Sequence, residues 1–321
     1  MNRTPTVPRT QHAVGRAASP SFAERAARWG QPLLAAAALL GILLWSYWRV
    51  VVVLFKEWQT DQNYSVGQLV PLAALYLLWQ ERHALVRCRV APSWWGAALI
   101  LLAQAARVFG ILYLFESAER YALVLTVAGI VLLVTGRQVF WRLRWILLFL
   151  ALMVPLPGRV HNLISGPLQT GATTGTVFLL ELFGVSVARE GNVIVLNDAQ
   201  ELAVAEACSG LRMLTAFIVV ASVFAYIVNR PRWQKTVLVV SSVPIAVACN
   251  LARLVLTAIL CLVASSAAAE KFLHDFAGIV FMMPLAIVLL LGEVWLMARL
   301  VLPESGGPGD RPAARAAGSR R

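Results

Sequence analysis

Long apolar runs alternate with short polar segments along most of this chain. There are eight such apolar runs, and several of them approach or exceed the roughly 18–20 residues that a helix needs to cross a bilayer. They cover residues 32–55, 66–80, 94–115, 121–136, 145–157, 203–228, 236–264 and 276–302. The pattern predicts an all-α fold, a polytopic integral membrane bundle of about eight transmembrane helices.

Residues 158–202 interrupt this alternation. The stretch to Thr176 is small, polar and glycine-rich, an apolar patch follows at 177–187, and Gly191–Asn192 is a turn signal before a β-branched run. We expect a short extracytoplasmic region with an interfacial helix and then a hairpin. A true span at 163–184 remains an alternative, although it would invert every later assignment and contradict the basic loops.

Composition and charge support a membrane protein rather than a nucleic-acid-binding one. The chain is 59% hydrophobic and only 14% charged, and its net charge of +12 is spread over the tails and alternate loops. Those loops are residues 81–89, 137–144 and 229–235. Because basic loops stay inside, both termini should be cytoplasmic, in the cell inner membrane. We expect disordered basic tails at 1–31 and 303–321 around a transmembrane domain at 32–302.

Cysteine usage excludes two common kinds of site. The four cysteines are Cys88, Cys208, Cys249 and Cys261, and three of them lie in apolar segments. They form no CxxC motif and no Cys/His pair at metal-ligand spacing. We therefore predict no disulfide framework, no metal and no cofactor.

The stretch Ala207–Arg212 (ACSGLR) places a thiol and a cation near the start of an apolar run. An arginine at a helix centre costs roughly 2.5–3.5 kcal/mol on insertion scales. In a helix Cys208 and Arg212 would share a face, at positions i and i+4. We interpret Cys208 as a nucleophile, and Arg212 as support for its thiolate or a contact for a phospholipid or a substrate carboxylate. The alternative is a small core thiol beside an arginine that snorkels to the interface.

Three chemically active residues converge on one layer of the predicted bundle. Cys208 lies roughly 7–8 Å inside the outer end of its span at 1.5 Å per residue, and Arg253 reaches a similar depth from the inner side. His274 precedes the last span on the outer side. A histidine can act as the base that a thiol needs, and an arginine can stabilise an oxyanion or hold a substrate carbonyl.

Other residues compete for these roles. His12 and His83 lie on the inner side, whereas His161 lies outside and is a second candidate base. Asn250 shares a helix face with Arg253, as a supporting residue or as a polar contact between helices. Cys249 lies deeper in apolar surroundings and is expected to be an inert core thiol.

The chain resembles the exosortase/archaeosortase family over about residues 55–300. The blocks that carry the resemblance are Trp58–Pro71 (WQTDQNYSVGQLVP), Ile164–Gln169 (ISGPLQ), Arg189–Ile194 (REGNVI), Ala207–Arg212 (ACSGLR), Pro244–Arg253 (PIAVACNLAR) and His274–Gly278 (HDFAG). The resemblance implies a catalytic set of Cys208, Arg253 and His274. One departure is Val66, which stands where the family's early block usually has a histidine.

The resemblance also implies partners and a host. The substrates would be membrane-anchored proteins with a C-terminal sorting signal of the PEP-CTERM kind, consisting of a short motif, a span and a basic tail. The host would be a Gram-negative bacterium that makes exopolysaccharide. The expected function is therefore that of a cysteine protease or transpeptidase whose active site faces the periplasm. Besides its substrates we expect it to contact the lipid bilayer, and we expect no nucleic-acid partner.

A non-enzymatic polysaccharide-export component or transporter is the alternative function. A transporter should place charged or glycine- and proline-broken segments near the bilayer midplane. In this sequence the polar residues gather in the outer layer, which favours the enzyme.

Overall fold

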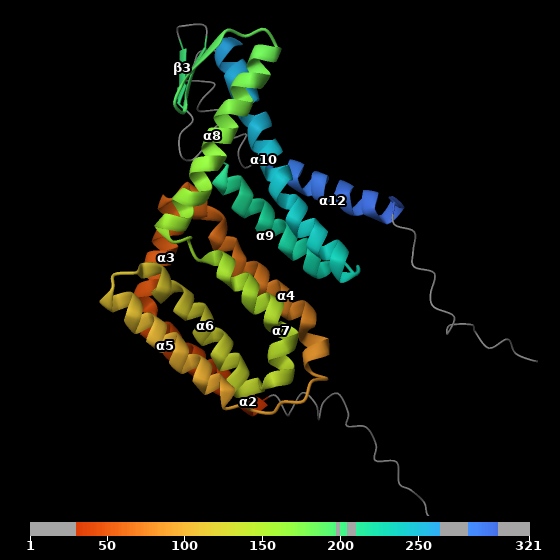
Figure 1. The fold of residues 1–321 in the computed structure, drawn as a ribbon. Helices are drawn as coiled ribbons and strands as arrows, with labels where there is room; N and C mark the ends of the chain where they lie inside the picture. Colours follow the sequence, from red (N-terminus) through yellow and green to blue (C-terminus); the bar gives the residue numbers. More distant parts are fainter. Residues whose placement is uncertain (1–29, 197–199, 204–209, 264–281, 301–321) are drawn as a thin grey trace, which may run out of the picture.

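The computed structural model describes residues 30–196, 200–203, 210–263 and 282–300, and the fold is helical as expected (Figure 1). The helices are α2 (Gly30–Ser46), α3 (Trp48–Thr60), α4 (Leu69–Leu85), α5 (Trp95–Leu112), α6 (Glu116–Thr135), α7 (Arg137–Phe149), α8 (Gly158–Leu182), α9 (Leu211–Ile227), α10 (Arg232–Val263) and α12 (Met282–Leu300). Two 3-10 helices, η1 (Gln62–Gln68) and η2 (Leu150–Met153), connect them, and three short strands follow α8.

Length and composition support a polytopic membrane protein. Within the described residues α5, α6 and α10 are long and apolar enough to cross a membrane. Two bent pairs raise this number to as many as five: α2 with α3, and α7 with α8. The all-α polytopic class is confirmed, whereas the count of eight spans stays a prediction.

The first apolar run is not one straight span as expected. The chain bends by 72° between α2 and α3. No proline causes this bend. Instead Arg107 from α5 donates from Nη2 to the Ser46 carbonyl at 2.7 Å and from Nη1 to the Ser46 hydroxyl at 2.8 Å. A side chain that inserts at a helix end in this way is a known cause of a kink.

Several polar segments expected as loops are helical instead. The segment Glu116–Arg120 forms the first turns of α6, and the basic segment 137–144 opens α7. Acidic residues suit the first turn of a helix, and Glu116 pairs with Arg120 one turn later at 2.7 Å. The apolar pattern therefore located α6 and α7 but set their starts a few residues too late.

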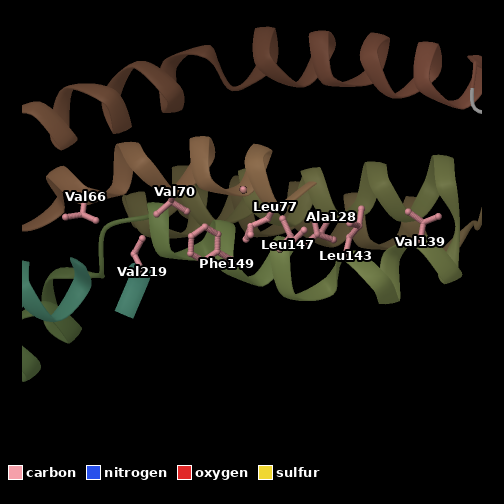
Figure 2. Close-up of a cluster of buried hydrophobic side chains, with 11 residues drawn as sticks. Val66, Val70, Leu77, Ala128, Val139, Leu143, Leu147, Phe149 and Val219 are labelled. Atoms are coloured by element: carbon pink, nitrogen blue, oxygen red, sulfur yellow. The ribbon is translucent and has the colours of Figure 1, made fainter. Parts of the chain in front are cut away.

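Buried side chains hold the helices together in separate apolar clusters. Figure 2 shows the largest of these clusters, to which α4 contributes Val70 and Leu77 and α7 contributes Val139 and Leu147. The cluster reaches Val219 of α9 and so joins the N-terminal bundle to the C-terminal helices. A second cluster packs α8 and α10 against the strands at the upper end of Figure 1.

The predicted hairpin after α8 is confirmed. Strands β1 (Val187–Glu190) and β2 (Val193–Leu196) pair antiparallel with Glu190 opposite Val193, so Gly191–Asn192 forms a two-residue loop. Gly191 has φ +64°, the conformation required at the first position of a type II′ turn. A third strand, β3 (Gln200–Ala203), pairs with β2 and was not predicted.

The start of the sixth predicted span is a correction. Residue 203 ends a strand, and α9 begins only at Leu211. The preceding Gly210 has φ +89°, a left-handed conformation that stops a right-handed helix. The helix that carries Arg212 therefore begins after Gly210 and not at residue 203. Cys208, the other member of the predicted i and i+4 pair, lies outside the described residues.

Candidate active site

The described residues hold part of the predicted catalytic set. Arg253 and its supporting residue Asn250 lie on α10, and Arg212 lies in the first turn of α9. Cys208 and His274 lie outside the described residues. The described part of the candidate site consists of the side chains that surround the start of α9.

Gly210, Asn250 and Arg253 form one contact between α9 and α10. Arg253 donates from Nη2 to the Asn250 Oδ1 at 3.0 Å, and Asn250 is only 2% exposed. A Cβ added to Gly210 would lie 2.9 Å from the Asn250 Nδ2. Glycine is therefore required here both for the left-handed backbone and for the close approach. Two sequence blocks about 40 residues apart meet at this point, as the predicted shared layer requires.

Arg253 has donor capacity to spare. Its Nε is buried, and no acceptor reaches it among the described residues. A buried donor without a partner is costly, so such groups are often found where a ligand or substrate binds. A guanidinium with one prong held by Asn250 and another donor uncommitted suits the binding of a carbonyl oxygen or an oxyanion.

Arg212 brings a second cation to the same region. Its Nη1 donates to the Oε1 of Gln62 on η1 at 3.3 Å, and it lies within electrostatic reach of Arg253. Neither guanidinium forms a salt bridge with any described residue. Both are held by neutral amide oxygens, so the local positive potential is retained.

The segment η1 packs tightly between three neighbours. The Asp61 carboxylate accepts from the Asn63 N–H at 2.8 Å and begins the turn, and the Asn63 carbonyl accepts from the Thr215 hydroxyl on α9 at 3.4 Å. Gly67 lies against the Trp58 indole, whose Nε1 donates to the Met153 carbonyl at 2.9 Å. The early block of the resemblance thus folds onto the start of α9.

His161 joins the opposite side of η1. It is buried in the first turn of α8, and its Nδ1 lies 2.6 Å from the Tyr64 hydroxyl. Burial, and next the negative charge of Asp61, raise the pKa of Tyr64 to about 12, so the phenol is neutral at neutral pH. The sequence predicted His161 as a second candidate base, and in the structure it contacts η1 through Tyr64.

A second polar cluster lies within the N-terminal bundle and was not predicted. Gln104 donates to the Tyr47 hydroxyl at 3.2 Å, and that hydroxyl lies 3.1 Å from the Thr126 hydroxyl. Arg107 stacks over the Tyr47 ring at 4.2 Å. Tyr47 and Thr126 are buried, so the cluster links helices instead of lining a path for solute. Gln104 and Arg107, three residues apart in an apolar run, were the available sequence signal.

Comparison with known proteins decides the family. The family model described as "Transmembrane exosortase" matches residues 58–292, well over half of the chain. The chain belongs to the transmembrane exosortase family. Exosortases are membrane-embedded sorting transpeptidases that act on substrates with a sorting signal. The match begins at Trp58 beside η1 and ends within α12, so it includes every residue of the site described above. No curated protein and no solved structure matches the chain.

Proposed function

We propose that this exosortase is a cysteine protease or transpeptidase that cleaves C-terminal sorting signals of the PEP-CTERM kind. Cys208 is the nucleophile, His274 the base, and Arg253 the group that binds the reacting carbonyl. Arg212 and Asn250 support them. The enzyme acts at the periplasmic face of the inner membrane on proteins exported together with surface polysaccharide.

The contact of Gly210 with Asn250 carries this proposal. Cys208 precedes Gly210 by two residues, and two residues of extended chain span at most about 7 Å between Cα atoms. Gly210 touches the amide that holds Arg253. Covalent geometry therefore tethers the proposed nucleophile close to the proposed oxyanion-binding arginine.

The surroundings of α9 favour an ionised thiol. The N-terminus of α9 carries partial positive charge, and Arg212 and Arg253 add two guanidinium groups without a described carboxylate partner. Cations and helix N-termini shift a cysteine toward thiolate, which is the nucleophilic form.

The reaction follows from these roles. His274 takes the thiol proton and leaves Cys208 as a thiolate, whose Sγ attacks the scissile carbonyl carbon, and the carbonyl oxygen becomes an oxyanion that Arg253 stabilises. The C–N bond then breaks, the leaving amine takes the proton from His274, and a thioester remains. Water or an acceptor amine attacks the thioester, and the thiol is restored.

The first experiment identifies the new C-terminus of a co-expressed candidate substrate by mass spectrometry. The wild-type chain should release a shortened substrate. Cys208→Ala should abolish processing with normal membrane insertion, because a lost thiol leaves only a small void. Cys208→Ser should be nearly inactive, because a hydroxyl is far less acidic than a thiol.

Matched controls come from the other thiols. Cys88→Ala, Cys249→Ala and Cys261→Ala should each retain processing, since Cys249 and Cys261 are buried in apolar clusters. Processing by Cys208→Ala, or its loss in Cys249→Ala alone, would show that the nucleophile is misassigned.

A further inference from the structure

The segment η1 contacts both helices that carry His161 and Arg212, which are α8 and α9. On one side the Tyr64 hydroxyl lies 2.6 Å from the His161 Nδ1 at the start of α8. On the other side Gln62 accepts from Arg212 at 3.3 Å. Tyr64 and Gln62 are two residues apart in one 3-10 helix of seven residues. Both contacts are therefore made from the first three residues of one short element, so we expect a displacement of Tyr64 to shift Gln62 as well.

A further contact strengthens the connection to α9. The Thr215 hydroxyl donates to the Asn63 carbonyl at 3.4 Å, and it also bonds the carbonyl of Arg212 itself at 2.9 Å. Asn63 is buried, and a Cβ added to Gly67 would lie only 2.5 Å from the Trp58 Nε1, so η1 packs closely against α3. The first turn of α9 is thus held to η1 by main chain as well as by side chain.

We propose that Tyr64 and His161 are positioning residues that set the location of the Arg212 guanidinium through η1. They act without touching the reacting atoms. The Tyr64–His161 hydrogen bond is short and partly buried, which makes it the stronger of the two ends. The bond from Arg212 to the exposed Gln62 is longer, so Arg212 follows η1 and does not fix it.

This inference rests on the proposed function in one respect, that Arg212 supports the Cys208 thiolate. The test therefore has a readout that needs no substrate. In a chain with Cys88, Cys249 and Cys261 replaced by alanine, Cys208 is the only thiol. The rate at which a membrane-impermeant maleimide labels it reports its thiolate fraction and access.

Removing the hydroxyl of Tyr64 should slow that labelling. Tyr64→Phe keeps the ring and should reduce the rate roughly three- to tenfold, the usual weight of one hydrogen bond. His161→Leu should have the same effect, whereas His161→Gln retains an acceptor and should keep most of the rate. Tyr113→Phe, at an exposed position directly after α5, is the matched control and should label at the wild-type rate.

A double-mutant cycle distinguishes positioning from a general loss of structure. Gln62→Leu should slow labelling by a similar factor, and Tyr64→Phe should add little in that background, because both changes release the same guanidinium. Independent, additive effects would overturn the proposal, as would an unchanged rate in Tyr64→Phe. Equal labelling of His161→Gln and His161→Leu would also overturn it.

Processing assays on the same variants separate this inference from the proposed function. If the labelling pattern holds but the wild-type chain cleaves no substrate, positioning stands and the protease proposal fails. If the wild-type chain cleaves substrate and Tyr64→Phe changes neither labelling nor processing, the protease proposal stands and positioning fails.

Discussion

At the residue scale, buried polar atoms are the best indicators of functional positions in this apolar chain. Each must be satisfied or must have a reason to be left without a partner, because lipid and packed side chains supply no hydrogen bonds. At the bend between α2 and α3, Arg107 uses its terminal nitrogens on Ser46. At the start of α9, the Arg253 Nε has no described acceptor. The Nε of Arg107 is likewise buried without a described acceptor. Arg107, however, commits both terminal nitrogens to Ser46 and so holds a bend, whereas Arg253 commits Nη2 to Asn250 and has donors left for substrate.

Processing should depend on the planar shape of the Arg253 guanidinium and not only on its charge. Arg253→Lys keeps the charge, but one ammonium cannot both hold Asn250 and reach a carbonyl oxygen. We expect normal insertion and a loss of processing of roughly 100-fold or more, the scale seen when an oxyanion donor is removed. Quantified substrate cleavage measures it, with Arg82→Lys at the far end of α4 as control. Near wild-type processing by Arg253→Lys would leave only a general electrostatic role.

Tyr64 should make stability depend on alkaline pH. Its folded pKa is raised from 10.0 to about 12, chiefly by burial, so folding favours the neutral phenol. That contribution is fully present below pH 10 and is lost as pH rises toward the folded value of about 12. The melting temperature of solubilised protein should therefore fall more steeply above about pH 10 in wild type than in Tyr64→Phe. Identical slopes in the two proteins would contradict the burial of this phenol.

At the scale of elements, the starts of α8 and α9 matter more than their lengths. Both begin beside η1, and each contributes a polar side chain to it within its first turn. The apolar pattern located the helices but set the start of α9 too early. The local signal for the true start was Gly210, since glycine readily adopts a left-handed backbone conformation, which interrupts a right-handed helix.

Gly210→Ala should test this element boundary. The added Cβ would be strained at φ +89° and would approach the Asn250 Nδ2 to 2.9 Å. We expect a destabilisation of about 1–2 kcal/mol or more from the backbone alone, together with loss of processing as Asn250 shifts. Gly166→Ala in α8 is the control, because nothing lies within 4 Å of its Cβ position. Thermal unfolding and substrate cleavage measure the two effects, and a variant that matches wild type in both would contradict the contact.

At the scale of the whole molecule, the orientation of α10 decides which face carries the site. The helix runs from Arg232 to Val263 with Asn250 and Arg253 in its second half. The basic segment 229–235 precedes it, which the positive-inside rule assigns to the cytoplasm. From this rule we expect the second half of α10, the hairpin and the start of α9 to lie toward the periplasm.

Reporter fusions should establish that orientation. A fusion after Arg232 should report a cytoplasmic location, and a fusion after Ala269 a periplasmic one. Activities of a cytoplasm-active and a periplasm-active reporter at both positions provide the measurement and the control. The reverse pattern would place Arg212, Asn250 and Arg253 on the cytoplasmic side and would remove the basis for a periplasmic active site.

The sequence by itself determined the class of the protein, the main helices and the hairpin turn, and it singled out Arg212, Asn250 and Arg253, which lie near one another beside the start of α9. Hydrophobic length and loop charge act locally, and the turn at Gly191–Asn192 depends on its own backbone. Arg253 and Asn250 stood out because polar groups in an apolar run are costly. Tertiary structure alone decided the bend at Ser46 and the position of η1. Each depends on contacts between residues far apart in the chain, such as Ser46 with Arg107 and Gln62 with Arg212, and no local pattern encodes which distant side chain arrives.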